Sequence, residues 1–142
     1  MNMLHKIRQG KTLNSEKGAA AVEFALLLPV LAALVFGMID FGIMLWQQEV
    51  LVNATREGAR QGILFGSGNG VSDIQGVVTQ YVNDGGLNAA GLNVAVTGVG
   101  TGVGNPLVVT STLPFQFIVA DKLIPGLTTN QLTAVVTMMN EG

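Results

Sequence analysis

The chain of 142 residues has room for one small domain with a tail or a membrane anchor. Hydrophobic residues make up 49% of it and charged residues only 11%, which is typical of a membrane-associated protein and not of a soluble domain. Residues 1–18 carry a net charge of +3 and the rest of the chain a net charge of −5, so the sequence does not suggest nucleic-acid binding. The absence of cysteine excludes disulfides, zinc–thiolate sites and thiol nucleophiles.

The first 18 residues form a polar, basic leader without a helical or strand period, and we expect it to lack regular structure. Residues 19–46 follow, and only Glu23 and Asp40 are charged among them. As a helix these 28 residues would span about 42 Å, more than the roughly 30 Å of a bilayer's hydrocarbon core. We therefore predict a transmembrane helix, with the basic N-terminus in the cytoplasm and most of the chain outside.

Two alternatives to a membrane anchor are less consistent with this segment. A buried helix of a soluble protein would need a larger core than the rest of the chain can supply. A secretory signal peptide would have its small residues after the apolar run, whereas Ala19–Ala21 precede it. Inside the run, Pro29 removes one backbone donor and predicts a kink or a loosened turn.

Glu23 lies about one turn from the start of the apolar run, where a carboxylate is costly unless it is paired or reaches the interface. One interpretation is an interfacial acid that snorkels or is protonated. The other is a carboxylate with a positive partner in another chain, which we prefer on the grounds given below.

From Gln47 the pattern becomes amphipathic and predicts that the helix continues outside the membrane to about residue 65. Gly58 and Gly62 lower helix propensity and suggest that another element packs closely there. The apolar stripe follows helical spacing and comprises Val50, Leu51, Ala54, Gly58, Gln61 or Gly62, and Phe65.

Polar side chains lie mostly off that stripe, and they allow two interpretations. Asn53, Arg56, Glu57 and Arg60 form either an ordinary solvated face with a Glu57–Arg60 ion pair, or a docking face for a partner subunit.

The remaining residues predict a short helix and a small sheet. Ser72 and Gln75 have capping-box spacing, and Asn83–Gly86 should end the helix. Three alternating stretches follow with short links, which favours an antiparallel meander. The predicted strands are Leu92–Thr97, Leu107–Leu113 and Leu132–Met138, with Phe115, Phe117 and Ile118 covering the sheet.

The expected fold is therefore α+β and pilin-like: a long N-terminal transmembrane helix extends out of the membrane and carries a small antiparallel β-sheet with one short helix. The expected parts are a basic leader (1–18), a transmembrane helix (19–46), its extramembrane continuation (47–65) and a small outer α+β domain (66–142).

Two motifs carry a family resemblance. Gly18, the small or aliphatic residues Ala19–Val22 and the pair Glu23–Phe24 before a long apolar helix resemble a type IV prepilin processing site. Asn53–Arg60 is similar to a recurring segment of the TadE-like family, the pseudopilins or minor pilins of the tight-adherence (Tad/Flp) pilus system. The C-terminal runs Leu113–Phe115 and Leu132–Glu141 also resemble that family's ending. The chain is larger than the short major Flp pilins, which favours the minor-pilin or pseudopilin role.

The resemblance implies that a prepilin peptidase cuts after Gly18, leaving Ala19 as the new N-terminus and Glu23 as the fifth mature residue. In pilin-like assemblies this Glu is thought to pair with the N-terminal amine of a neighbouring subunit. Opposite charges attract strongly in a low dielectric, so such a pair would set the register between helices. The implied location is the bacterial inner membrane with incorporation into a pilus, and the implied partners are other pilin or pseudopilin subunits.

The residues offer little for catalysis. His5 lies in the leader, and the acids of the outer part lack metal-ligand spacing. We therefore expect no enzymatic activity, cofactor or small-molecule substrate. The alternative to a pilin-like assembly subunit is an uncleaved single-pass anchor whose outer domain binds a partner in a secretion complex.

Overall fold

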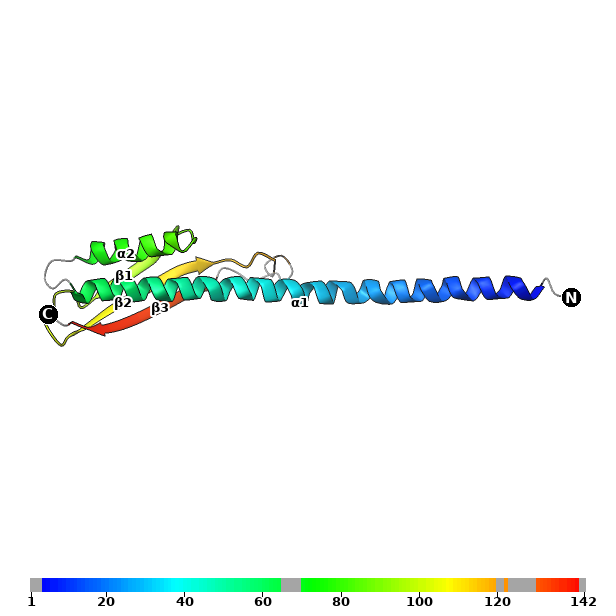
Figure 1. Cartoon of the computed structure of the whole chain (residues 1–142), viewed down its shortest axis with the longest axis horizontal. Helices are drawn as coiled ribbons and strands as arrows, with labels where there is room; N and C mark the ends of the chain where they lie inside the picture. Colours follow the sequence, from blue (N-terminus) through cyan, green and yellow to red (C-terminus); the bar gives the residue numbers. More distant parts are fainter. Residues whose placement is uncertain (1–3, 65–69, 120–121, 123–129, 141–142) are drawn as a thin grey trace. The chain divides into compact units, whose positions relative to one another are not determined.

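The computed structural model describes residues 4–64, 70–119, 122 and 130–140, and for residues 4–15 and 64 it describes the backbone alone. The elements are helix α1 (Leu4–Leu64), helix α2 (Val71–Asp84) and strands β1 (Asn93–Thr97), β2 (Pro106–Phe115) and β3 (Asn130–Met139) (Figure 1). A long N-terminal helix, a short helix and a three-stranded antiparallel sheet confirm the predicted α+β class. The chain divides into two compact units between Ile39 and Asp40.

The first unit is the N-terminal part of α1. Its residues 16–39 are all exposed except Ala32, which is half-buried. Within the described residues, α1 is the one helix long and apolar enough to cross a membrane. Because exposed apolar surface is unfavourable in water, at about 25 cal/mol per Å², this segment requires cover from lipid or from other helices.

The leader differs from the prediction, because α1 begins at Leu4 and runs through residues 4–18 without a break. The expectation of a tail without regular structure is therefore wrong for these residues. Extending an existing helix costs no new nucleation, and Leu, Lys, Arg and Gln are good helix formers. The helix also continues through Pro29.

In the second unit the sheet is the predicted meander. Its order is β1-β2-β3, and both pairs are antiparallel. Side chains alternate along β2, so that Leu107, Val109, Ser111 and Leu113 are buried on one face, as predicted. Leu132 and Ala134 of β3 continue the same buried layer. One face of the sheet thus supplies half of the core.

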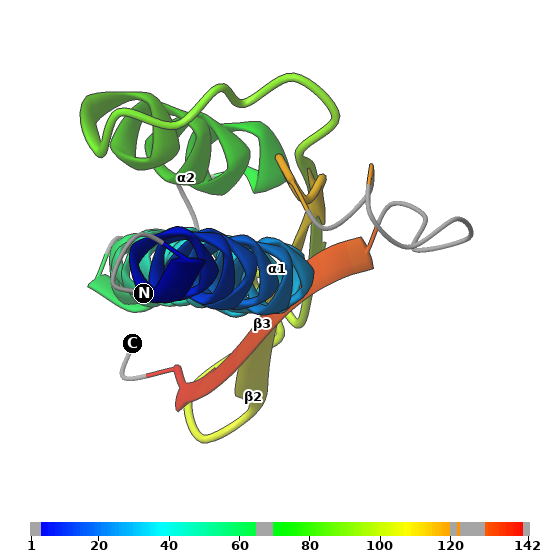
Figure 2. The same ribbon diagram turned by 90° about the vertical axis from the view of Figure 1, so that its right-hand side faces the viewer.

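The C-terminal part of α1 supplies much of the other half. Figure 2 shows α2 on one side of α1 and strands β2 and β3 on the other. Leu51, Ala54 and Gly58 of the predicted stripe are buried, and so are Thr55 and Ala59, which the stripe did not include. Phe65 lies outside the described residues.

At Gly58 and Gly62, helix α1 packs closely against neighbouring elements, which confirms the packing expected from these positions. A Cβ at Gly58 would collide with the side chain of Val78 on α2. A Cβ at Gly62 would lie 2.5 Å from Leu107 Cδ2 and 2.8 Å from Ile74 Cδ1, so α1, α2 and β2 meet at this turn.

Helix α2 begins differently from the prediction. Its N-cap is Gly70, whose N–H donates to Oδ2 of Asp73 at 2.9 Å, so the box expected from Ser72 and Gln75 is wrong. Asp73 occupies the N3 position, where a carboxylate can reach back to the N-cap N–H. Gln75 instead donates from Nε2 to the carbonyl oxygen of Val94 on the outer strand β1, at 2.8 Å. The helix ends at Asp84 before Gly85, as expected.

Candidate functional site

The predicted processing residues lie on one continuous stretch of α1. Gly18, Ala19 and Glu23 are helical and exposed. A Cβ at Gly18 would meet none of the described atoms within 4 Å, so packing against the described residues does not require glycine there. Glu23 follows Gly18 by five positions, which corresponds to about 7.5 Å along a helix. Among the described residues no salt bridge to Glu23 forms within the chain.

The predicted docking residues form a polar face on the part of α1 outside the apolar stretch. Asn53 donates from Nδ2 to Oε1 of Glu49 at 3.1 Å, and Arg56 donates from Nη1 to Oδ1 of Asn53 at 3.5 Å. One turn further, Arg60 donates to both carboxylate oxygens of Glu57, at 3.0 and 2.6 Å. These side chains therefore lie together along one helix.

The Glu57–Arg60 pair is a bidentate contact at the surface. Hydrogen bonding and charge from Arg60 hold the pKa of Glu57 below its ordinary value, while partial burial acts in the opposite direction. The same contact raises the pKa of Arg60. The two charges of this pair neutralise each other, and because both side chains retain access to solvent the pair contributes little to stability.

Asp40 is a residue whose role the sequence did not reveal. It is 1% exposed, although it lies inside an apolar stretch of the helix. Its Oδ1 accepts a hydrogen bond from the backbone N–H of Ile118 at 3.2 Å, and its Oδ2 accepts one from that of Val119 at 3.0 Å. These charge-assisted bonds fasten the segment after β2 to the first turn of the second unit. A lone acid in an apolar run was the available signal, because such a group must find partners.

The segment after β2 also corrects a prediction about the sheet. Phe115 is buried in the core and its ring contacts that of Phe117 edge-on, with centroids 5.0 Å apart. Ile118 is exposed and does not cover the sheet. Residues 120–121 and 123–129, which follow this segment, lie outside the described part of the chain.

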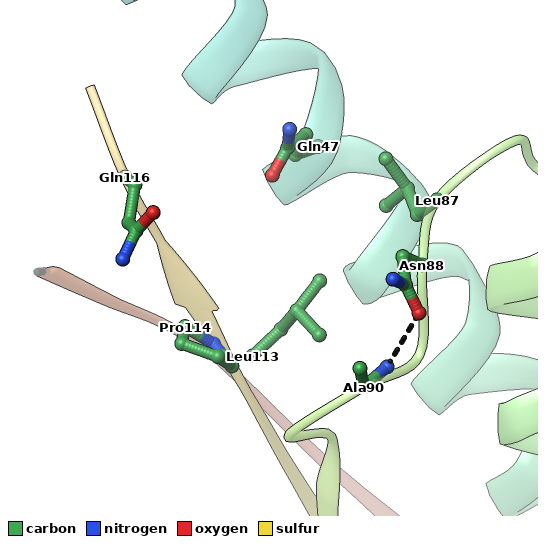
Figure 3. Close-up of a pocket in the computed structure, with 7 residues that line it drawn as sticks. All are labelled: Gln47, Leu87, Asn88, Ala90, Leu113, Pro114 and Gln116. Atoms are coloured by element: carbon green, nitrogen blue, oxygen red, sulfur yellow. Dashed lines mark hydrogen bonds between the residues drawn. The ribbon is translucent and has the colours of Figure 1, made fainter. Parts of the chain in front are cut away.

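A small cavity of 290 Å³ lies in the second unit between α1, the chain before β1 and the end of β2 (Figure 3). Gln47 of α1 and Gln116 beyond β2 contribute uncharged amides, and Asn88 accepts a hydrogen bond from the N–H of Ala90 at 2.9 Å (Figure 3). The residues that line the cavity are Gln47, Leu87, Asn88, Ala90, Leu113, Pro114 and Gln116. None of them is an acid, a base or a nucleophile. Nowhere among the described residues do three His, Asp or Glu side chains come together to hold a metal ion.

The family described as TadE-like protein matches residues 18–60, which confirms the resemblance over this segment. No curated protein and no solved structure is significantly similar to the chain. Members of this family are structural components of Tad pilus systems. The match therefore favours a minor pilin-like protein associated with such a pilus. The matched residues all lie within α1, and they include the predicted processing residues, Asp40 and the polar face.

Proposed function

Taking the TadE-like segment at residues 18–60 as the premise, we propose that this chain is a pilin-like membrane subunit for assembly of a Tad/Flp-type pilus or secretion machine. The observation that carries the proposal is that the family match lies wholly within α1 and ends before α2 and the sheet. What the chain has in common with the family is therefore a helix, which favours helix packing over chemistry in the outer domain.

The apolar half of that helix supports a place in the membrane. Residues 16–39 expose almost every side chain, and a bilayer or neighbouring helices would cover them. The basic leader stays in the cytoplasm and the α+β domain lies outside the inner membrane, because cationic flanks are retained on the cytoplasmic side. In this arrangement residues 19–46 span the membrane, 47–65 extend beyond it and 66–142 form the outer domain.

The start of α1 supports processing. A membrane-embedded prepilin peptidase removes residues 1–18 by cutting after Gly18, and Ala19 becomes the N-terminus. The glycine adds no side chain at the scissile bond, and no atom of the described residues within 4 Å would obstruct a Cβ on this side of the helix.

Glu23 then acts as the register charge between subunits. Its carboxylate is exposed on an apolar helix, where a lone charge is costly and a cationic partner is strongly favoured. The new amine of Ala19 in a neighbouring pilin or pseudopilin supplies that partner. A pair of this kind fixes how far one helix slides along the next.

The polar face formed by Asn53, Arg56, Glu57 and Arg60 is the second proposed contact between subunits. It continues along the same helix outside the membrane. Glu57 and Arg60 neutralise each other, and Arg56 is linked through Asn53 to Glu49, so the charges balance once Glu49 is included. Like faces of successive subunits can therefore approach without net repulsion. Neither a small-molecule substrate nor a nucleic acid enters this function.

One observation favours the alternative of an uncleaved single-pass anchor that binds a partner in a secretion complex. The helix runs unbroken through Gly18 and Ala19, so the peptide bond to be cut lies inside a hydrogen-bonded helix. Cleavage then requires this turn to open first. Gly18 eases that opening, because glycine lowers helix stability by about 1 kcal/mol relative to alanine.

Oxidative cross-linking tests the assembly role, because the chain has no cysteine of its own. Single cysteines are placed in turn at the exposed positions 30, 31 and 33–36 in cells that make the other pilus proteins. A packed helix should give cross-links that recur with helical periodicity, and Glu23→Gln should reduce them. Glu49→Gln, an acid of the same helix outside the apolar stretch, is the matched control and should leave them unchanged. Cross-links without periodicity, or undiminished by Glu23→Gln, would contradict packing through a register charge.

A further inference from the structure

The segment that follows β2 is fastened to α1 near the beginning of the second unit. Asp40 holds the N–H groups of Ile118 and Val119 with its two carboxylate oxygens, at 3.2 and 3.0 Å. Within the segment, the ring of Phe117 contacts that of the buried Phe115 edge-on. Figure 1 shows this segment beside α1, beyond the end of β2. Its position along the helix is therefore that of residue 40.

That position can be compared with the predicted membrane surface. Trp46 is exposed, and tryptophan is enriched where a membrane meets water. Trp46 follows Asp40 by six positions, so at 1.5 Å per residue the fastened segment lies about 9 Å nearer the membrane centre than Trp46, measured along the helix. If Trp46 marks the interface, Ile118 is therefore at the level of the lipid headgroups or just below them.

The surface at this level is apolar. The side chain of Ile118 is 58% exposed, although its backbone N–H is bound by Asp40. Phe41 and Leu45, on the turns of α1 that follow Asp40, are also exposed. Lys122, also exposed, donates its backbone N–H to the carbonyl of Val119 at 3.1 Å, and its cationic side chain is suited to lipid phosphates.

We propose that the segment Phe117–Val119 is a second membrane contact, in which Ile118 enters the interfacial layer of the outer leaflet of the phospholipid bilayer. This inference rests on the proposed membrane-spanning role of α1. The contact is an extension of that interface, because the fastened segment shares its level and its apolar character with the adjoining turns of α1. Asp40 makes this possible, since its charge is hidden beneath the segment and not presented to lipid.

The single tryptophan of the chain allows a direct test in the full-length protein. Trp46→Phe removes the native signal, and one new tryptophan is then introduced as Ile118→Trp, Val103→Trp or Leu34→Trp. Val103, 74% exposed in the β1–β2 connection, is the matched exposed control, and Leu34 reports on the anchor itself. Each protein is reconstituted in phosphatidylcholine–phosphatidylglycerol vesicles whose acyl chains are brominated near the headgroup.

Ile118→Trp should lose about half of its emission to the brominated lipid and shift to shorter wavelength, as expected 5–10 Å inside an interface. Val103→Trp should keep its emission. If Ile118→Trp behaves like Val103→Trp while Leu34→Trp is quenched, the second contact is refuted and the anchor stands. A blue-shifted but unquenched Ile118→Trp would mean that protein covers this surface, which also refutes the inference. An unquenched Leu34→Trp would overturn the membrane-spanning role itself.

Discussion

Replacing Gly58 with alanine should destabilise the second unit, because α1 and α2 meet there without room for a methyl group. The added Cβ would collide with Cγ2 of Val78 and lie 3.4 Å from both Cγ2 and the carbonyl oxygen of Ile74. Val78 is fully buried, and a β-branched side chain in a helix is held in one strongly preferred rotamer. Since Val78 cannot turn away, the two helices have to move apart.

The size of the effect follows from two opposing contributions. Overpacking a core costs about 1–3 kcal/mol, whereas alanine improves helix propensity over glycine by about 1 kcal/mol. We therefore expect Gly58→Ala to lower the free energy of unfolding by up to about 2 kcal/mol. Gly62→Ala should lower it less, because the atoms nearest its Cβ are the ends of the Leu107 and Ile74 side chains, which can move.

Urea unfolding of the full chain in detergent micelles, followed by the emission of Trp46, measures these differences. Gly37→Ala is the control, because a Cβ at Gly37 would meet nothing within 4 Å. The expected order of stability is Gly37→Ala and the unsubstituted chain together, then Gly62→Ala, then Gly58→Ala. If Gly58→Ala is as stable as the unsubstituted chain or more stable, the packing argument is refuted.

Three further substitutions can be compared by the same titration. Asp40→Asn replaces one acceptor with a donor that faces a backbone N–H, so the free energy of unfolding should fall by about 1–3 kcal/mol, and an unchanged value would contradict the role of the carboxylate. Ser111→Ala should leave stability unchanged or raise it by up to about 1 kcal/mol, because the buried Oγ has no hydrogen-bond partner among the described residues. A clear loss of stability would show that this hydroxyl is satisfied. The Glu57–Arg60 contact lowers the pKa of Glu57, so its stabilisation is present near neutral pH and is lost as the pH falls through that lowered pKa. Glu57→Gln should therefore differ slightly from the unsubstituted chain near neutral pH and coincide with it in acid, and a difference that persists in acid would argue against the ion pair.

Local patterns were sufficient for most of the fold. The 3.6-residue period placed Leu51, Ala54 and Gly58 on the buried side of α1, because one helix face has to meet the sheet. The two-residue alternation identified the strands for the same reason. Thr55 was missed because a hydroxyl does not fit an apolar stripe. It is buried nonetheless, since Oγ1 donates to the carbonyl of Leu51 at 2.7 Å.

Contacts between distant positions could not be predicted from such patterns. The donors to Asp40 are 78 and 79 residues away in the chain. They are backbone N–H groups, which the side-chain pattern of a sequence does not distinguish from any others. The start of α2 was missed for a local reason. Ser72 and Asp73 both have side chains that can accept a hydrogen bond at the start of a helix. Which of them does so depends on the backbone around Gly70. At the proposed processing site, by contrast, the informative residues are neighbours in sequence, and Gly18 and Glu23 fall within the family match.

The mass of the mature chain tests the central claim of a processed, pilin-like subunit most directly. In cells with an active prepilin peptidase, intact-mass spectrometry should find a chain that begins at Ala19 and lacks residues 1–18. Gly18→Phe should retain the leader, while Gly37→Phe, at an equally open glycine of the same helix, should be processed normally. An unsubstituted chain that still begins at Met1 under these conditions would contradict the account and favour the uncleaved anchor.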